Sequence, residues 1–177
     1  MDEAIDLEIV KRVGEALRDR EDTLAVAESC TGGLIGGALT EVPGSSDYFE
    51  CGLTTYSYGT KRQFLGVSRE ALDDHGAVSE EVALEMARGV RDVADTTWGV
   101  ATTGIAGPSG GTAENPIGTV YIAVAYAAPW ESGASYATAS RYEFDGDRPA
   151  VRAKTVERAL TDLEDELGRE AGLERSR

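Results

Sequence analysis

The sequence predicts an α/β fold of the three-layer α/β/α type, with a mixed, mostly parallel central sheet. Short apolar runs of strand length alternate with segments whose apolar residues recur at helical spacing, which is typical of layered α/β domains. Two consecutive strand-like segments late in the chain, 118–127 and 136–144, form an antiparallel pair and make the sheet mixed. The 177 residues suit a single domain spanning 1–177.

The expected elements follow from apolar spacing and from capping signals. Ile5, Ile9 and Val13 predict a helix over about 3–20, within an N-terminal segment 1–22. Ser79, followed by two glutamates, predicts the N-cap of another helix. A closing helix occupies about 147–168, and we expect 169–177 to fray. The remaining expectations are strands over 23–27, 48–58 and 96–102, and helices over 34–40, 67–75 and 79–94.

The charge balance narrows the choice of partners. The chain carries 32 acidic and 17 basic residues, a net charge of −15, and only three lysines. This charge repels phosphodiester backbones, so a nucleic-acid partner is not expected. Acidic residues spread over the whole surface, with few lysines, favour the hypothesis of a protein adapted to concentrated salt.

Other classes are disfavoured by what the sequence lacks. No apolar run approaches the ~18 residues of a membrane span, and the acidic N-terminus is unlike a signal peptide. We therefore expect a cytoplasmic protein with no membrane partner. Two cysteines and one histidine cannot supply a disulfide framework or a four-ligand zinc site, so no metal is expected.

Two glycine-containing loops each follow a predicted strand. The first, Thr31-Gly32-Gly33, opens a helix and offers N–H groups to an anion, although a tight turn capped by Thr31 explains it equally well. The second contains four glycines between Gly104 and Gly111 and follows Thr102 and Thr103. If the two preceding strands are parallel neighbours, both loops converge on one crevice, where ligands bind in such sheets.

The candidate base is Lys61, which follows a segment rich in hydroxyl groups. A lysine becomes a base once desolvation lowers its pKa, which arginine cannot do. The candidate hydroxyl nucleophiles are Ser29, Ser45 and Ser46, each of which also suits a capping role. Glu28, Cys30 and Lys61 would supply the parts of a Glu–Lys–Cys amidase, but Ser29 and Cys30 point to opposite faces of an extended strand, and Cys30 suits the core.

Two arginines, Arg148 and Arg152, lie one turn apart at the start of the closing helix. They could hold a phosphate, or they could pair with the acidic residues nearby.

Several ordered motifs together resemble a known family. They are Ala27-Glu28-Ser29-Cys30-Thr31-Gly32-Gly33, Pro43-Gly44-Ser45-Ser46, Thr55-Tyr56-Ser57 with Lys61, Gly76-Ala77-Val78-Ser79, Thr103-Gly104-Ile105-Ala106-Gly107-Pro108 and Pro116-Ile117-Gly118-Thr119-Val120. This pattern resembles the C-terminal domain of the CinA (competence/damage-inducible) family from about residue 23 to 152. The domain also occurs alone, as nicotinamide-nucleotide amidase, and that stand-alone form is the one expected here.

The resemblance implies deamidation of nicotinamide mononucleotide to nicotinic acid mononucleotide and ammonia, a step of pyridine-nucleotide salvage, without a cofactor. It implies a serine and a lysine at the centre: Ser46 is the first choice of nucleophile and Ser29 the alternative, Lys61 is the base, and Tyr56 is a relay. Ser29 and Thr103 would line the site and hold the amide or its oxyanion. The implied substrate and phosphate ligands are Thr31, Gly32, Gly33, Ser45, Gly104, Gly107 and Arg148.

The family also suggests a homo-oligomer. A domain of the same fold that binds a phosphorylated nucleotide or a partner without catalysis is the alternative function.

Overall fold

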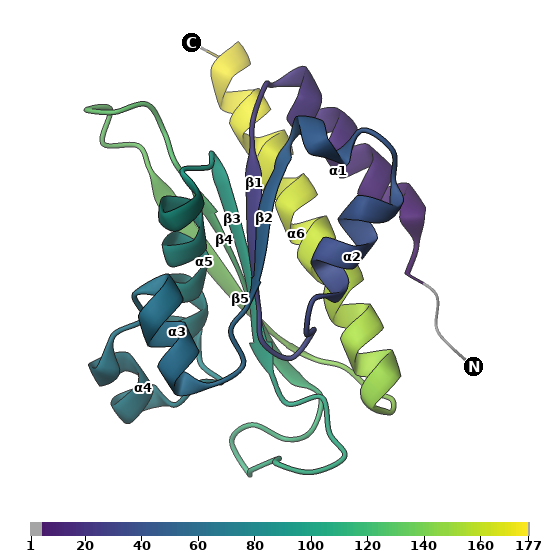
Figure 1. The fold of residues 1–177 in the computed structure, drawn as a ribbon, viewed down its shortest axis with the longest axis vertical. Coiled ribbons are helices and arrows are strands. Elements are labelled where there is room, and N and C mark those ends of the chain that lie inside the picture. The colour runs from purple at the N-terminus through teal and green to yellow at the C-terminus, as the bar shows by residue number, and fades with distance from the viewer. Residues whose placement is uncertain (1–4, 177) are drawn as a thin grey trace.

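The computed structural model describes residues 5–176 and shows a five-stranded sheet with helices on both faces (Figure 1). The strands lie in the order β2-β1-β3-β4-β5. They are β1 (Leu24–Glu28), β2 (Phe49–Thr54), β3 (Trp98–Gly104), β4 (Thr119–Tyr126) and β5 (Tyr136–Glu143). The helices are α1 (Leu7–Asp19), α2 (Leu34–Glu41), the short 3-10 helix η1 (Ser45–Asp47), α3 (Tyr58–Leu65), α4 (Arg69–His75), α5 (Glu80–Ala94) and α6 (Arg148–Arg175).

The sheet is mixed in the way the sequence predicts. β1 pairs in parallel with β2 on one side and with β3 on the other. β4 runs antiparallel to both β3 and β5, so four of the five strands point in the same direction. The predicted α/β fold with a mixed, mostly parallel sheet is confirmed.

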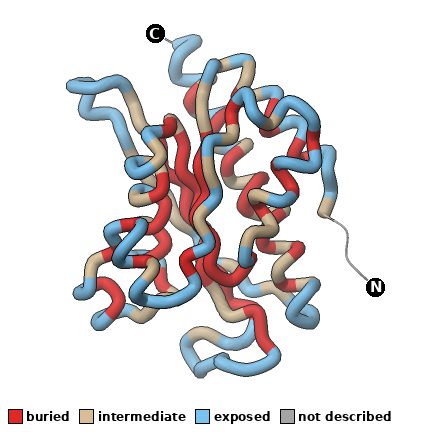
Figure 2. Tube along the Cα trace, in the orientation of Figure 1, coloured by how far each residue is buried: buried red, intermediate tan, exposed pale blue. Residues whose placement is uncertain are grey.

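Each face of the sheet carries its own hydrophobic core. On one face, α1, α2 and α6 bury large side chains such as Leu17, Leu39 and Leu160. On the other face, α5 and the shorter α3 and α4 pack against small strand residues such as Ala25 and Ala101. Figure 2 shows the buried residues concentrated in the central strands and on the sides of the helices that face them. The two cores hold the strand ends at fixed positions.

The predicted strand 48–58 is too long, because a helix begins within it. Ser57 accepts a hydrogen bond from the Thr60 N–H, and Thr60 caps the Ser57 N–H in return, which forms a capping box. β2 therefore ends at Thr54, and Lys61 lies within α3, a helix that apolar spacing did not reveal.

The expected fraying of 169–177 is also wrong over the described residues, because α6 continues to Arg175. Glu174 in its last turn forms an ion pair with Arg20 and so ties the end of α6 to the end of α1. At the other terminus α1 begins at Leu7, and residues 1–4 and 177 lie outside the described residues.

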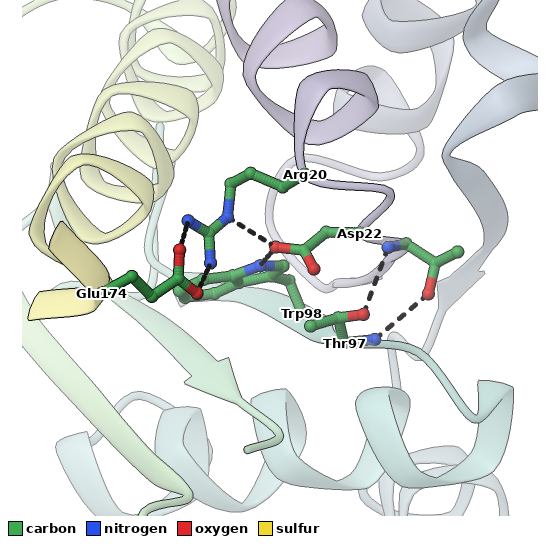
Figure 3. Close-up of polar contacts among 6 residues, drawn as sticks. Arg20, Asp22, Thr97, Trp98 and Glu174 are labelled. Carbon is green, nitrogen blue, oxygen red and sulfur yellow. Dashed lines mark hydrogen bonds and ion pairs between the residues drawn. The ribbon is translucent and has the colours of Figure 1, made fainter. Parts of the chain in front are cut away.

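A network of polar contacts closes the amino end of the sheet, where β1 and β3 begin (Figure 3). The Arg20 guanidinium contacts Asp22 at 2.8 Å and Glu174 at 3.1 Å. The buried Trp98 donates its indole N–H to Asp22 at 2.9 Å. Thr97 and Thr23 exchange backbone-to-hydroxyl hydrogen bonds at 3.1 and 3.3 Å. Every charged group of this network therefore faces a partner of opposite charge or a donor.

Within residues 5–176, no helix combines the length and the apolar composition that crossing a membrane requires.

Candidate active site

The carboxyl ends of β1 and β3 lie side by side. They are at the end of the sheet opposite the polar contacts of Arg20, Asp22 and Trp98. Because β1 and β3 are parallel neighbours, the loops that follow them converge, as the sequence predicts. A cavity of about 190 Å³ lies between these loops. It is lined by Ser29, Cys30, Tyr56, Lys61, Ala77, Val78, Thr103, Gly104, Ala106 and Arg148.

Ser29 and Lys61 form a direct contact in this cavity. Ser29 comes directly after β1, and Lys61 lies in the first half of α3, just beyond the end of β2. The Lys61 Nζ lies 2.8 Å from the Ser29 Oγ, and both residues are buried. The strand order brings them together, because β1 and β2 are parallel neighbours whose chains leave the sheet at the same edge.

Lys61 is held without an opposite charge. Its side chain is 1% exposed, and its amine donates to the Thr55 carbonyl at 2.7 Å and to the Tyr56 carbonyl at 3.4 Å. Among residues 5–176, no carboxylate forms a salt bridge with it. Burial penalises the ammonium and lowers the pKa of Lys61 to about 8.

The three contacts of Lys61 match the three donors of its ammonium form, which donates to the Ser29 hydroxyl and to the two carbonyls. An uncharged amine has two N–H bonds and one lone pair. When the ammonium loses the proton that points to Ser29, the two carbonyls keep the two remaining N–H bonds and the lone pair faces the Ser29 hydroxyl. The geometry therefore lets Lys61 accept a proton from Ser29.

Ser46, the first choice of nucleophile, lies at the wrong end of the sheet. It is an exposed residue of η1, which precedes β2, whereas Lys61 follows β2. Six strand residues span about 20 Å, which separates Ser46 and its neighbour Ser45 from the cavity. Ser29, the alternative from sequence, is the serine that the structure places against Lys61.

Tyr56 lines the cavity, but its phenol does not reach the amine of Lys61. The side chain is 61% exposed, and its hydroxyl accepts a hydrogen bond from Arg148 at 3.2 Å. Only the Tyr56 carbonyl contacts Lys61. A role as proton relay is therefore unsupported, and Tyr56 instead forms part of the cavity wall.

Arg148, the first residue of α6, bridges the segment after β2 and the loop after β3 beside the cavity. Besides its hydrogen bond to the Tyr56 hydroxyl, Arg148 donates a hydrogen bond to the Gly107 carbonyl at 2.8 Å. In the described part of the chain, Arg148 forms no salt bridge despite the excess of acidic residues. A guanidinium left free of carboxylates can bind an anionic ligand.

Thr103 lies in the cavity as expected and presents acceptor lone pairs. Its hydroxyl donates to the Ala77 carbonyl at 2.6 Å, so its proton is already in use. It can accept from an amide NH₂ group but is not free to donate to an oxyanion. Gly104 also lines the cavity, and a Cβ there would lie 2.7 Å from the Thr119 carbonyl oxygen, which explains the glycine by close packing.

The predicted anion site at the start of α2 is filled by the protein itself. The Glu28 carboxylate accepts N–H bonds from Gly33 at 3.1 Å, Ile35 at 3.1 Å and Gly36 at 2.9 Å. Thr31 is fully buried, and its hydroxyl contacts that of Thr102 at 2.8 Å. The Gly33 N–H is therefore already bound at this helix end, the Thr31 hydroxyl lies against Thr102, and the exposed Gly32 lies beside the Arg152 guanidinium.

Cys30 borders the cavity but is chemically inert there. It is 6% exposed, and burial raises the pKa of its thiol to about 11. The thiolate is the nucleophilic form, so the Glu–Lys–Cys alternative loses its nucleophile. It also loses its glutamate, because the Glu28 carboxylate already accepts hydrogen bonds from three backbone N–H groups at the start of α2.

Sequence reasoning missed three contributions to the site. The Thr55 carbonyl and the Ala77 carbonyl carry no side-chain signal, so no pattern could reveal them. The role of Glu28 had a signal, since an acidic residue shortly before a helix start suits the positive end of the helix dipole. In the part of the chain that is described, no group of three or more His, Cys, Asp or Glu residues is arranged to hold a metal ion.

Comparison with known proteins places the chain in a family. Residues 6–167 match the family model described as the CinA C-terminal domain. The chain belongs to the CinA C-terminal domain family. CinA-like proteins of Geotalea uraniireducens and Salinibacter ruber are 48% and 51% identical over 81% and 77% of this chain. Those alignments cover 32% and 31% of the relatives, so the chain spans about a third of their length.

Solved structures of the CinA superfamily share the fold over most of their length. A CinA superfamily protein of Klebsiella pneumoniae is 36% identical with a TM-score of 0.84, covering 92% of this chain and 98% of that one. A competence/damage-inducible protein of Agrobacterium tumefaciens is 40% identical with a TM-score of 0.82, covering 92% and 94%.

Proposed function

We propose that this CinA-family domain is an amidohydrolase that converts nicotinamide mononucleotide to nicotinic acid mononucleotide and ammonia, with Ser29 as nucleophile and Lys61 as base. The observation that carries the proposal is the 2.8 Å contact between the Ser29 hydroxyl and a buried amine. Its pKa of about 8 leaves about a tenth of that amine neutral at pH 7.

The reaction proceeds in two halves. Ser29 Oγ attacks the carboxamide carbon while its proton passes to Lys61 Nζ, and the carbonyl oxygen takes the negative charge. The C–N bond then breaks, and Lys61 returns that proton to the departing nitrogen. The nitrogen leaves as ammonia, and the acyl group remains on Ser29 as an ester. In the second half, water loses a proton to Lys61 and attacks the ester carbon. The ester C–O bond breaks, Lys61 passes that proton to Ser29 Oγ, and the product acid leaves as the carboxylate after losing its own proton to solvent.

The size of the cavity supports a small group, such as a carboxamide on a ring, as the reacting part of the substrate. Its volume of about 190 Å³ is below the roughly 300 Å³ of pockets that enclose whole ligands. The pyridine ring would enter while the ribose phosphate stays outside, near Arg148. Thr103 can accept from the amide NH₂, and Arg148 can exchange its bonds to Tyr56 and Gly107 for bonds to the phosphate.

The test is the release of ammonia from nicotinamide mononucleotide by the purified protein. The nucleotide product is separated by chromatography, and protein with Ser29→Ala is the control. The assay is run in low salt and in molar KCl, because we also propose that a chain of net charge −15 requires salt. Absence of product at both salt concentrations would contradict the proposed amidase activity. Binding of the nucleotide in calorimetry, without turnover, would favour the non-catalytic alternative.

A further inference from the structure

The carboxylate of Glu28 is buried next to the site, at the start of α2, without a cationic partner. The side chain is 1% exposed, and within residues 5–176 no Lys, Arg or His forms a salt bridge with it. Its three partners are backbone N–H groups in the first turn of α2. Such charge-assisted bonds at the positive end of a helix dipole can hold a buried anion.

These bonds close the turn that carries Ser29. The segment from Ser29 to Gly33 joins β1 to α2, and Glu28 precedes it while Gly33 ends it. The carboxylate therefore links the two ends of a five-residue turn. Gly33 has φ +96° and supplies no side chain to cap α2, so Glu28 takes the place of the missing cap.

The backbone of Glu28 and its neighbour extends this link to Lys61. The Glu28 carbonyl accepts from the Thr55 N–H at 2.9 Å, and the Thr55 carbonyl accepts from Lys61 at 2.7 Å. On the other side, the Ser29 N–H donates to the Thr102 carbonyl at 3.0 Å. Glu28 is thus joined to both members of the Ser29–Lys61 pair.

We infer that Glu28 is a positioning residue that sets the Ser29 hydroxyl against the Lys61 amine by anchoring the turn to the start of α2. The inference builds on the proposed amidase. It also explains why a substrate anion would bind near Arg148 and not at α2, because the helix end is already occupied by the protein's own carboxylate.

The deciding variant is Glu28→Ala, which removes a group with the atoms of acetate. We expect kcat to fall roughly 100-fold with KM within about threefold, because a shift of about 1 Å at a nucleophile has an effect of this size. Added acetate should restore a measurable part of kcat by refilling the start of α2, whereas an equal concentration of chloride should not. Hydrogen exchange should become faster at the Gly33, Ile35 and Gly36 amides and slow again with acetate.

The matched control is Glu85→Ala, which removes the same atoms at another helix start. Glu85 is also a partly buried carboxylate that holds a helix start, accepting from the Ser68 N–H and hydroxyl at 2.7 and 3.0 Å. Those contacts lie at α4, among residues that do not line the cavity. We expect kcat to stay within about twofold of the wild type, with no response to acetate.

If Glu28→Ala does not fold, Glu28→Gln serves instead, since it keeps the volume but turns an NH₂ group toward N–H donors. A folded Glu28→Gln protein should lose kcat without a matching rise in KM. Unchanged kcat in either folded variant overturns the inference, and so does a loss in Glu28→Ala that acetate fails to reverse.

The inference can be separated from the proposed reaction. If the wild type releases no ammonia, the amidase fails, and Ser29 labelling by a sulfonyl fluoride, followed by intact-protein mass, becomes the readout. Glu28→Ala should then label roughly tenfold more slowly, with recovery in acetate. Equal labelling rates in wild type and variant would overturn the positioning role.

Discussion

At the amino end of the sheet Arg20 lies between Asp22 and Glu174, whereas at the carboxyl end Lys61 lies against an alcohol and two carbonyls. Both are cationic side chains in protected positions on the same domain. The first is matched by opposite charges, and the second is left with neutral acceptors. Pairing with carboxylates keeps a cation charged, whereas burial among neutral acceptors lowers the pH at which it gives up its proton. A cationic side chain thus stabilises the fold at the amino end of the sheet, whereas at the carboxyl end a similar group is made reactive.

The largest effect expected from this contrast is the loss of turnover in Ser29→Ala. Removing the nucleophile should lower kcat at least about 10⁴-fold, with little change in melting temperature, because the structure loses only one hydroxyl and its hydrogen bond to Lys61. Ser46→Ala is the matched control and should keep full activity, since η1 lies at the other end of β2. Ammonia release by the two variants checks this, and the opposite result would return Ser46 to the site.

Lys61→Met should also abolish turnover, and it separates reactivity from stability. In the wild type the pKa is about 8 in the folded state and near 10.5 when unfolded. Between these values the unfolded chain binds one more proton, so the stability of the wild type rises with pH and the cost of burying the ammonium remains at lower pH. Relative to Lys61→Met, the wild type should gain about 3 kcal/mol from pH 7 to 10.5.

Denaturant unfolding of both proteins at several pH values measures that difference. At each pH, both proteins are measured in the same buffer and at the same ionic strength. The effects of pH on all other charged groups then cancel between the two proteins. A difference in stability that does not vary with pH would mean that Lys61 keeps its proton in the folded protein.

Arg148→Ala should have a smaller effect that depends on the substrate. Without the guanidinium, KM for nicotinamide mononucleotide should rise roughly 10- to 100-fold, while the dephosphorylated nucleoside is affected much less. Arg88→Ala, which removes an exposed arginine of α5, is the control for the change in net charge. Equal losses for both substrates would show that Arg148 shapes the cavity and does not select the phosphate.

The smallest effect is expected at the amino end and should not reach the reaction. Asp22→Asn removes the charge that faces Arg20 and weakens the bond from the Trp98 indole. We expect the free energy of unfolding to fall by about 1–2 kcal/mol with kcat unchanged. Thermal unfolding and the ammonia assay measure the two quantities, and a loss of kcat in the folded variant would couple ends that the comparison keeps apart.

The convergence of the loops after β1 and β3 could be predicted from the sequence, but the identity of the serine next to Lys61 could not. The apolar runs before Ser29 and Thr103 place both at strand ends, and parallel pairing then brings them together. Choosing between Ser29 and Ser46 needed the direction of β2 relative to η1, which is a property of topology. The capping pair of Ser57 and Thr60 did signal the helix of Lys61, but the aromatic and threonine content before it favoured a longer strand.

Side-chain direction was the other quantity that sequence could not supply. Thr31 and Gly33 have the composition of an anion site, yet the carboxylate of Glu28 turns into that position. Tyr56 has the chemistry of a relay, yet its ring turns out to Arg148. Both outcomes depend on which way a side chain leaves the end of a strand and on what is already there to meet it.

The two tryptophans offer intrinsic fluorescent reporters of very different environment. Trp98 is fully buried where β3 begins, and Trp130 is 96% exposed in the β4–β5 connection. A soluble quencher such as acrylamide therefore silences Trp130 and leaves the emission of Trp98. Because β3 runs from Trp98 to the wall of the cavity at Thr103, that residual signal records whether filling the cavity is transmitted along the strand to its far end.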